Sequence, residues 1–470
     1  MTQPKRQLGV LVAAAIVVAN MIGAGVFTSA GFTAAFQFKD PWSMMSTWLV
    51  GGVIALCGAA CYAELGSRMP HAGGEYVYLR EAYHPAFGFM SGWVSLVVGF
   101  SAPIAFAALL FASFVGAIFP AVAGTAAMKA IACVLILAMT ALHAFDTRLG
   151  GRVQTGLTIA KVTLIVVFIL AGLFVGHGDW SHFASRGDGL SQLGTRHGAA
   201  NYATALMYVS FAYSGWNAAA YVAGEIEHPQ RTLPRALLVG TGAVMLLYIG
   251  LNLVFLYAVP PEAMAIDPIK HPVGDIAARA LFGEHAGSTL SSLIAIALMS
   301  AVSAMMMAGP RVYATMAADH ALPRQLAYYS KRGVPVVAVG VQCVLAIAFT
   351  LFSDPDHLLR LTGFTLAMFA TLTVGAVFVM RRRDRRDAAG VARATVESGG
   401  KGPVAPTGFR TPLYPIAPLL FVALSVWTVI FGVSAEPKLS AEILAVLVAG
   451  AVVYTVSSRG KPRTPIEADE

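Results

Sequence analysis

Twelve stretches of about 20 mainly apolar residues follow one another along this chain, and about 20 such residues let an α-helix cross a bilayer. Charged residues make up only 12% of the sequence, against roughly 25% in soluble domains, and 57% of the residues are hydrophobic. The sequence therefore predicts an all-α polytopic membrane protein. The expected transmembrane helices lie at 8–36, 42–66, 86–119, 124–144, 152–175, 200–226, 233–259, 286–317, 334–353, 358–381, 413–434 and 440–457.

Two of these stretches are interrupted near their middle by small residues. The first contains Gly23-Ala24-Gly25, and the sixth contains Ser214-Gly215. A break in a membrane helix exposes backbone N–H and C=O groups that lipid cannot satisfy, so it persists only inside protein or beside a cavity. Paired broken helices in two halves of a chain are typical of a transporter's binding site. Close helix packing is the alternative explanation, because glycine is common in membrane helices.

The positions of the breaks predict two repeats. Five spans form a unit at residues 8–175 and five more form a unit at 200–381, each starting with a broken helix. Because an odd number of spans reverses the chain direction, we expect the second unit to be inverted relative to the first. A cytoplasmic linker at 382–412, whose composition suggests little fixed structure, leads to two further helices at 413–457.

The net charge of +8 is distributed in a way that argues against nucleic-acid binding. Lys and Arg are concentrated in the loops on one side, including the run at 381–410, and this positive-inside bias places both termini in the cytoplasm. We expect a multi-pass protein of a bacterial inner (plasma) membrane, surrounded by lipid. The segment 68–85 is expected at the membrane interface, with Tyr76, Tyr78 and Tyr83 at headgroup depth.

The broken helices suggest how a zwitterion could be held without charged side chains. The half-helix that resumes after Gly25 presents N–H groups and a positive dipole end, which attract a carboxylate. The half-helix that ends near Met21 presents carbonyl groups, which suit an ammonium group. The second break, from Phe211 to Gly215, offers the same two kinds of helix end in the opposite direction.

Lys161 lies deep within the fifth predicted span. A lysine there is costly, by about 2.5–3.5 kcal/mol on insertion scales, so we expect it to face the bundle interior and have a partner. Burial disfavours the charged form, which opens a route to proton exchange. Ser300 and Ser303 of the eighth span are the expected neighbours of its ammonium group. A purely structural or snorkelling lysine is the alternative.

Aromatic and acidic residues near the breaks and the span ends allow both a functional and a structural interpretation. Phe211, Tyr213 and Trp216 surround the second break and could close over a ligand, although aromatic residues in membrane helices mostly pack. Glu64 and Glu225 lie near cytoplasmic span ends and precede basic residues. They could pair within a gate, but ordinary ion pairs at the membrane interface are favoured.

Signatures of enzymes and cofactors are absent from the sequence. There is no P-loop, HExxH or GxSxG motif, and the Gly23-Ala24-Gly25 run lacks the third glycine and the preceding strand of a dinucleotide fingerprint. The four cysteines all lie in predicted spans, where packing is favoured over a metal site or a disulfide. We therefore expect neither an enzyme nor a bound metal or cofactor.

Several segments resemble the amino acid–polyamine–organocation superfamily of transporters. ANMIGAGVF resembles its first-helix signature, and FAYSGWNAAAYVAGEIEHPQRTLPRAL is similar to its sixth-helix signature. AELGSRMPHAGGEYVYLREAYHPAFGFMSGW resembles the segment between helices two and three, and AGPRVYATMAADHALP the end of helix eight. The resemblance covers most of residues 8–335 and is closest to L-type and related bacterial amino acid transporters. It implies the leucine-transporter fold, with two inverted five-helix units and two further helices.

The resemblance also implies a substrate site. The substrate carboxylate would accept hydrogen bonds from backbone N–H groups at Gly23-Ala24-Gly25, in particular those of Ala24 and Gly25. The ammonium group would donate to the carbonyls of Met21, Phe211 and Ser214. Phe211 matches an aromatic gate, and Asn217 could contact the substrate. Lys161 matches a lysine that stands where sodium-coupled relatives bind sodium, which argues against sodium coupling. These assigned positions are Met21, Gly23, Ala24, Gly25, Phe211, Ser214, Gly215 and Asn217.

Three departures from the family pattern limit the partners and substrates. Residues 119–127 contain no cysteine, so we expect no disulfide-linked heavy subunit. Ala24 provides no hydroxyl group at the centre of the first break. No acidic side chain stands near either break in the sequence, which weighs against polyamines and strongly cationic substrates.

These observations predict a secondary active transporter of L-amino acids, most of all neutral ones, that works by alternating access. Proton symport and obligate exchange both remain open, and protons are a possible coupling ion. A non-transporting amino acid sensor is the alternative from another class, but such a protein needs an output domain. A channel would need a continuous polar stripe, and none is evident.

Overall fold

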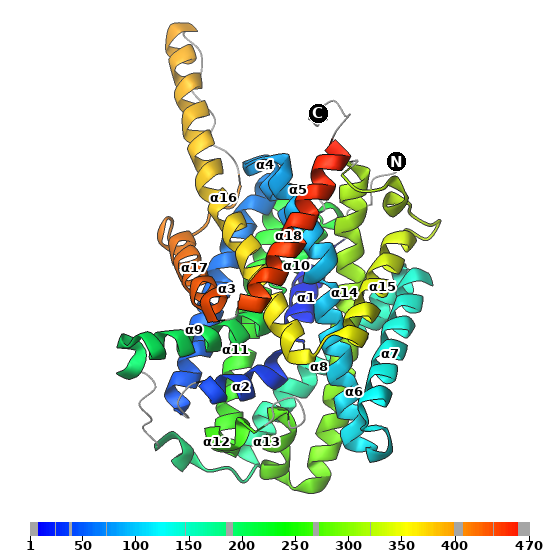
Figure 1. Cartoon of the computed structure of the whole chain (residues 1–470). Coiled ribbons are helices and arrows are strands. Elements are labelled where there is room, and N and C mark those ends of the chain that lie inside the picture. Colours follow the sequence, from blue (N-terminus) through cyan, green and yellow to red (C-terminus); the bar gives the residue numbers. More distant parts are fainter. Residues whose placement is uncertain are drawn as a thin grey trace.

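The computed structural model describes residues 8–23, 25–36, 40–71, 73–145, 147–184, 191–266, 272–319, 321–398, 408–435 and 437–458. Within these ranges the regular structure is helical, apart from an isolated β-bridge between Leu8 and Ile226. The helices form a tall bundle (Figure 1). The expected all-α class is confirmed.

The elements are arranged along the chain in the order that the apolar pattern predicts. The α-helices are α1 (Val10–Met21), α2 (Gly25–Phe36), α3 (Pro41–Arg68), α4 (Glu75–Ala82), α5 (Pro85–Val94), α6 (Ser101–Ile118), α7 (Thr125–Phe145), α8 (Thr147–Phe174), α9 (Arg196–Ala212), α10 (Ala218–Tyr221), α11 (Pro229–Ala258), α12 (Pro261–Met264), α13 (Val273–Phe282), α14 (Glu284–Ala318), α15 (Val336–Phe352), α16 (Pro355–Ser398), α17 (Ile416–Ala435) and α18 (Pro437–Ser458). Shorter helical segments are η1 (Ser95–Gly99), η2 (Pro120–Val122), η3 (Trp180–Ala184), η4 (Ser191–Gly194), η5 (Ala223–Glu225) and η6 (Arg324–Ala327).

Eight helices in the described part of the chain are long and apolar enough to cross a membrane, and the bent pair α1 and α2 makes a ninth candidate. Two more apolar helices, Val336–Phe352 and Ile416–Phe431, are shorter. The sixth predicted stretch is divided among α9, α10 and η5. These helices identify a multi-pass membrane protein.

One predicted span begins at a helix cap, and another is interrupted by a π-helical turn. The carboxylate of Asp40 accepts hydrogen bonds from the N–H groups of Trp42 and Ser43, at 3.2 and 3.3 Å, and so caps α3. The span that begins at Pro85 does not continue as one α-helix, because η1 is a π-helical turn between α5 and α6. Such turns often occur at functional sites, and Ser95 and Gly99 of η1 line the cavity described below.

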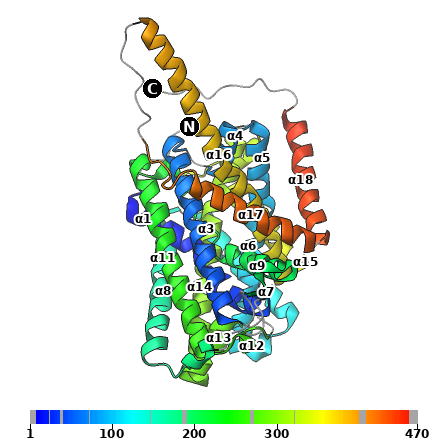
Figure 2. The same ribbon diagram turned by 90° about the vertical axis from the view of Figure 1, so that its left-hand side faces the viewer.

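The packing brings the two broken helices together at the centre of the bundle. α11 packs against both α1 and α3, α2 packs against α9, and α14 packs against α6. α17 contacts α16, α3 and α9, whereas α18 stands at the edge of the bundle in Figure 2. α4 lies at one end of the bundle and α12 and α13 at the other (Figures 1 and 2).

The expectation that the linker has little fixed structure is wrong for residues 382–398. α16 continues to Ser398, so residues 382–398 are helical and project from the bundle in Figure 1, because arginine and alanine favour helix even without packing. Residues 399–407 of the expected linker lie outside the described ranges. Tyr76 and Tyr78 are 3% and 0% exposed, because α4 packs against α5 and α16.

Candidate functional site

The first predicted break is confirmed. α1 ends at Met21 and the chain becomes helical again at Gly25, with the two helices inclined at 42°. The N–H of Ile22 donates to Val18 and closes the last turn of α1. Ala24, to which the resemblance assigns an N–H for the carboxylate, lies outside the described residues.

The second predicted break is also confirmed. α9 ends at Ala212 and α10 begins at Ala218, and the turn between them places Gly215 at φ +93°, a conformation that favours glycine. The carbonyl of Phe211 accepts a hydrogen bond from the N–H of Ser214 at 2.9 Å. The sixth span is therefore divided by an open turn at Ser214-Gly215.

Each break has a glycine against which the backbone of the other broken helix packs closely. A Cβ atom on Gly25 would lie 2.6 Å from the Cα atom of Ala212, and a Cβ on Gly215 would lie 2.9 Å from the carbonyl of Asn20. No real side chain has such close contacts, so these two glycines are needed for the breaks to pack against each other. Gly23 is different, since a Cβ there would meet Ala301 at 3.7 Å, an ordinary contact.

Lys161 of α8 finds its partners at the first break. Its side chain is 1% exposed, and Nζ donates to the carbonyls of Ala19 and Ile22 at 2.6 and 2.7 Å. These carbonyls belong to the C-terminal end of α1, where the helix dipole favours a positive charge. The lysine therefore faces the bundle interior as predicted and occupies carbonyl groups that the break leaves free.

Tyr248 of α11 contacts both breaks, and sequence reasoning missed it. Its hydroxyl lies 2.6 Å from the carbonyl of Met21, to which it donates, and 3.1 Å from the carbonyl of Ala212. A buried tyrosine normally needs a hydrogen-bond partner, which is the only signal in the sequence that could have singled it out. Because Met21 already accepts this bond, its carbonyl is less available to a substrate ammonium than the resemblance implies.

Serines 300 and 303 do not hydrogen-bond to Lys161. The hydroxyl of Ser300 accepts from the amide of Gln154 at 3.3 Å, and Ser303 lies 2.8 Å from the imidazole of His143. Both serines are fully buried. The ammonium group of Lys161 instead binds carbonyls of α1, and the expectation that the two serines are its neighbours stays a prediction.

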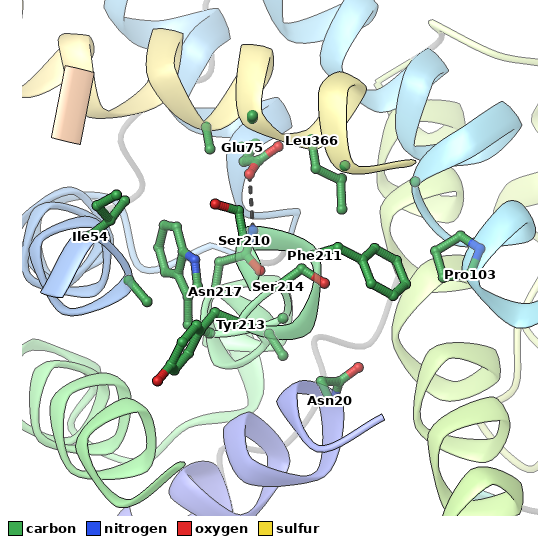
Figure 3. Close-up of a pocket in the computed structure, with 18 of the residues that line it drawn as sticks. Asn20, Ile54, Glu75, Pro103, Ser210, Phe211, Tyr213, Ser214, Asn217 and Leu366 are labelled. Atoms are coloured by element: carbon green, nitrogen blue, oxygen red, sulfur yellow. Dashed lines mark hydrogen bonds between the residues drawn. The ribbon is translucent and has the colours of Figure 1, made fainter. Parts of the chain in front are cut away.

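A cavity of about 120 Å³ adjoins the second break (Figure 3). Phe211, Ser214, Gly215 and Asn217 line it, together with Asn20 from α1. Further wall residues come from α3, α4, η1, α6, α9, α10, α14, α16 and α17. Figure 3 shows Ile54 and Pro103 on opposite sides and Glu75 above the serines. The lining does not include Met21, Gly23, Gly25 or Lys161.

Glu75 places a carboxylate at the cavity, which corrects the expectation that no acidic side chain lies near a break. It is the only charged residue in the described lining and is 4% exposed. Oε1 accepts from Nδ2 of Asn217 at 2.9 Å, and Asn217 also donates to the hydroxyl of Tyr221. The sequence could not predict this contact, because Glu75 and Asn217 lie in different halves of the chain.

The three aromatic residues at the second break have different surroundings. Phe211 packs edge-on against Phe106 of α6, with ring centroids 5.5 Å apart. The hydroxyl of Tyr213 donates to the carbonyl of Trp48 at 3.1 Å. Trp216 stands edge-on to Tyr62 at 4.6 Å. All three line the cavity, but Tyr213 and Trp216 are held on its α3 side.

The two acids near the span ends form ion pairs. Glu64 is 0% exposed and binds Arg68 and Arg381 at 2.8 and 2.6 Å. Glu225 pairs at 3.0 Å with Arg311 of α14, a partner from a different part of the chain.

Leu8 contacts the segment that follows the second break. The backbone of Leu8 hydrogen-bonds to the carbonyl of Glu225 and the N–H of Glu227, each at 3.0 Å. All four cysteines are free thiols, and no cluster of metal-ligating side chains occurs among the described residues.

Comparison with known proteins agrees with this architecture. The profile of a family described as amino acid permease matches residues 8–455. The chain is 30% identical to the serine/threonine exchanger SteT of Bacillus subtilis, with 89% of each chain covered. It is also 30% identical to the b(0,+)-type amino acid transporter 1 of Mus musculus, over 81% of this chain and 77% of the relative.

A more distant relative, the large neutral amino acids transporter small subunit 2 of Mus musculus, is 26% identical over 96% of this chain and 80% of its own length. The match to the family profile extends over nearly the whole chain and includes both broken helices. The chain therefore belongs to the amino acid permease family of the amino acid–polyamine–organocation superfamily and is a membrane protein of amino acid transport.

Proposed function

We propose that this protein is a secondary active transporter that moves neutral L-amino acids by alternating access. The observation that carries the proposal is the cavity beside the second break, which combines backbone and hydroxyl groups of the turn with a mainly apolar wall. The carboxylate of Glu75 in that wall is already hydrogen-bonded by Tyr62 and Asn217. Such a site suits a small zwitterion with an uncharged side chain. The names of two relatives, a serine/threonine exchanger and a large neutral amino acids transporter, support the same substrate class.

The substrate would lie between the two breaks. Its carboxylate would accept from N–H groups at Gly23-Ala24-Gly25, where α2 begins, because that end of the helix carries the positive dipole. Its ammonium group would donate to carbonyls at Phe211 and Ser214, with the second lone pair of the Met21 carbonyl as a further acceptor. Asn217 and Phe211 would contact the rest of the molecule, and Phe211 with Tyr213 and Trp216 would form the gate.

Lys161 replaces a sodium ion in this proposal. Its ammonium group already binds two carbonyls at the end of α1, at 2.6 and 2.7 Å, which supplies the positive charge that a cation would supply. Loss of its proton would release these carbonyls and loosen the first break. The lysine is therefore the proposed coupling group, without the direct help of Ser300 and Ser303.

The proposed architecture has twelve spans and an inverted repeat. Eight long helices, the bent pair, the divided sixth helix and two shorter apolar helices account for twelve crossings. Residues 8–175 and 200–381 would form the two inverted units, with helices at 413–457 outside them. The arginines of α16 at the α4 end of the bundle support a cytoplasmic location for that end and for both termini.

The transporter is proposed to act without a disulfide-linked partner, in the inner membrane of a bacterium. Cys61 and Cys343 are buried, and Cys57 and Cys133 are only partly exposed within helices. Co-purification under non-reducing conditions would test this point, since a covalent partner would appear as a larger band that disappears on reduction.

Uptake into proteoliposomes tests the function. Purified protein would be reconstituted, and each labelled L-amino acid would be offered to vesicles loaded with unlabelled amino acids or held under a proton gradient. We expect saturable uptake of a subset of neutral amino acids. The absence of uptake of every amino acid under both conditions contradicts the proposal.

Obligate exchange is the second candidate mode, and the similarity to an exchanger favours it. An exchanger takes up labelled substrate only into vesicles that already contain substrate. A proton symporter accumulates substrate in empty vesicles when a proton gradient is imposed. Comparing empty with loaded vesicles under the same gradient therefore separates the two modes.

A further inference from the structure

Glu75 is held in the wall of the cavity by three donors, one each from α3, α5 and the turn before α10. Tyr62 of α3 donates to Oε1 at 2.5 Å, and Asn217, just after the second break, donates to the same atom at 2.9 Å. Ser91 of α5 lies 3.4 Å from Oε2. The carboxylate thus connects α4, α3 and α5 to the turn that precedes α10.

No positive charge compensates this carboxylate in the described part of the chain. Arg80, the nearest basic residue on α4, pairs instead with Asp319 and Glu81. Arg383 of α16 donates to backbone carbonyls at the far end of α4. An uncompensated buried carboxylate is unstable unless it is strongly hydrogen-bonded or binds a proton.

The titratable groups that face Glu75 are tyrosines. They are Tyr62 of α3, Tyr78 of α4 and Tyr221 of α10, and all are neutral at ordinary pH. Burial raises the pKa of Glu75, while the hydrogen bonds from Tyr62, Asn217 and Ser91 oppose the rise. The carboxyl group is therefore the group in this cluster that can gain a proton as the pH falls.

Protonation would change the contact with the second break. The Oε1 atom accepts from both Tyr62 and Asn217, and a carboxylate accepts more strongly than a neutral acid. Asn217 uses its amide on Glu75 and Tyr221 together, so it fixes the start of α10 relative to α4. A neutral Glu75 holds that turn less tightly.

We propose that Glu75 binds a proton at the cavity wall. Through its hydrogen bond to Asn217, the protonation state of Glu75 then controls the position of the second break. The ionised form fixes the turn at Asn217 against α4, and the protonated form lets it move. The site is separate from Lys161, which acts on the first break. The consequence for transport rests on the proposed function, whereas proton binding itself does not.

Infrared spectroscopy on the purified full-length protein tests proton binding without transport. A difference spectrum between about pH 5 and pH 8 shows the C=O stretch of any carboxyl group that titrates in that range. We expect one band of the wild type to be lost in Glu75→Gln and kept in Glu81→Gln, a change at an exposed position of the same helix. A spectrum of Glu75→Gln equal to that of the wild type overturns the proposal.

Thermal unfolding gives a second measurement with a definite sign. Because the pKa of Glu75 is raised in the folded protein, its ionised form is destabilised at neutral pH, and that penalty disappears as the pH falls through the folded pKa. Glu75→Gln should therefore have a higher Tm than the wild type at neutral pH and an equal Tm in acid. An equal difference at every pH contradicts proton binding.

Exchange rates in vesicles with the same pH on both sides test the link to transport. The wild type should change its rate with pH, whereas Glu75→Gln should depend on pH less steeply, because only Lys161 remains, and Glu81→Gln should keep the wild-type profile. A wild-type profile in Glu75→Gln overturns the link. If the wild type carries no amino acid but its infrared band is lost in Glu75→Gln, the proton site is supported and the proposed function is not.

Discussion

The two broken helices have similar sequences of small residues but different surroundings. At the first break, side chains from α8 and α11 occupy the free carbonyls of Ala19, Met21 and Ile22. At the second break, Ser214 and Gly215 border the cavity. Side chains of the protein thus hydrogen-bond the carbonyls of the first break, whereas the second break borders the cavity.

This difference shows that a helix break is not by itself a binding site. The free backbone groups must be hydrogen-bonded in either case, because lipid cannot satisfy them. Lys161 and Tyr248 meet this need for the carbonyls of the first break. At the second break Tyr248 also reaches the carbonyl of Ala212, the N–H of Ser214 donates to Phe211, and the turn borders the cavity. The two breaks nevertheless depend on each other, since Gly25 packs against Ala212 and Gly215 against Asn20.

Changing Gly25 to leucine should have the largest effect on this arrangement. Even a Cβ atom would lie 2.6 Å from Ala212, so the breaks must separate, and overpacking alone destabilises by about 1–3 kcal/mol. We expect loss of substrate binding and transport in proteoliposomes. Gly242→Ala on α11, where a Cβ would meet nothing within 4 Å, is the matched control. Transport by Gly25→Leu at the wild-type rate means that the site is assigned wrongly.

Removing the side chain of Lys161 should abolish proton coupling while substrate binding and exchange continue. Lys161→Ala leaves the carbonyls of Ala19 and Ile22 without their donor, at about 1–3 kcal/mol for each unsatisfied group. We expect gradient-driven uptake to be lost while exchange between loaded vesicles continues at a reduced rate. Accumulation that still depends on pH in this variant shows that another group couples the proton.

Removing one hydroxyl group should weaken the link between the two breaks. Tyr248→Phe deletes the group that bridges Met21 and Ala212, and we expect a loss of about 1 kcal/mol in the free energy of unfolding. Tyr257→Phe on the same helix is the control, because no side-chain hydrogen bond of Tyr257 occurs among the described residues. Equal Tm values for the two variants would show that the bridge contributes nothing.

The smallest effect is expected at Ser300. Its hydroxyl accepts one long hydrogen bond from Gln154, and Gln154 keeps its bond to Thr158 when the serine is changed. Ser300→Ala should therefore cost less than about 1 kcal/mol and should leave the pH dependence of transport unchanged. A strong loss of the pH dependence of transport in Ser300→Ala would contradict this prediction and show that the serine assists Lys161.

The sequence predicted the features that depend on a long apolar pattern or on an unusual residue within it. The two breaks appear at Gly23–Gly25 and Ser214–Gly215, and Lys161 faces the interior, because the bilayer leaves each of these features few alternatives. The partners of these groups could not be predicted. Helix periodicity suggested Ser300 as a neighbour of Lys161, whereas the hydrogen bonds of its ammonium group go to carbonyls at the end of α1.

The helical class and the location of both breaks follow from the sequence alone, since about 20 apolar residues, or a glycine within them, constrain the local backbone in lipid. The family follows from the resemblance of sequence motifs around those breaks. The tertiary structure alone decided that Glu75 meets Asn217, that Tyr248 bridges the breaks, and that only the second break borders the cavity. Those contacts join residues from distant helices. No local sequence pattern encodes which side chain lies within hydrogen-bond distance of a free carbonyl, because the packing of the whole bundle sets the distance between them.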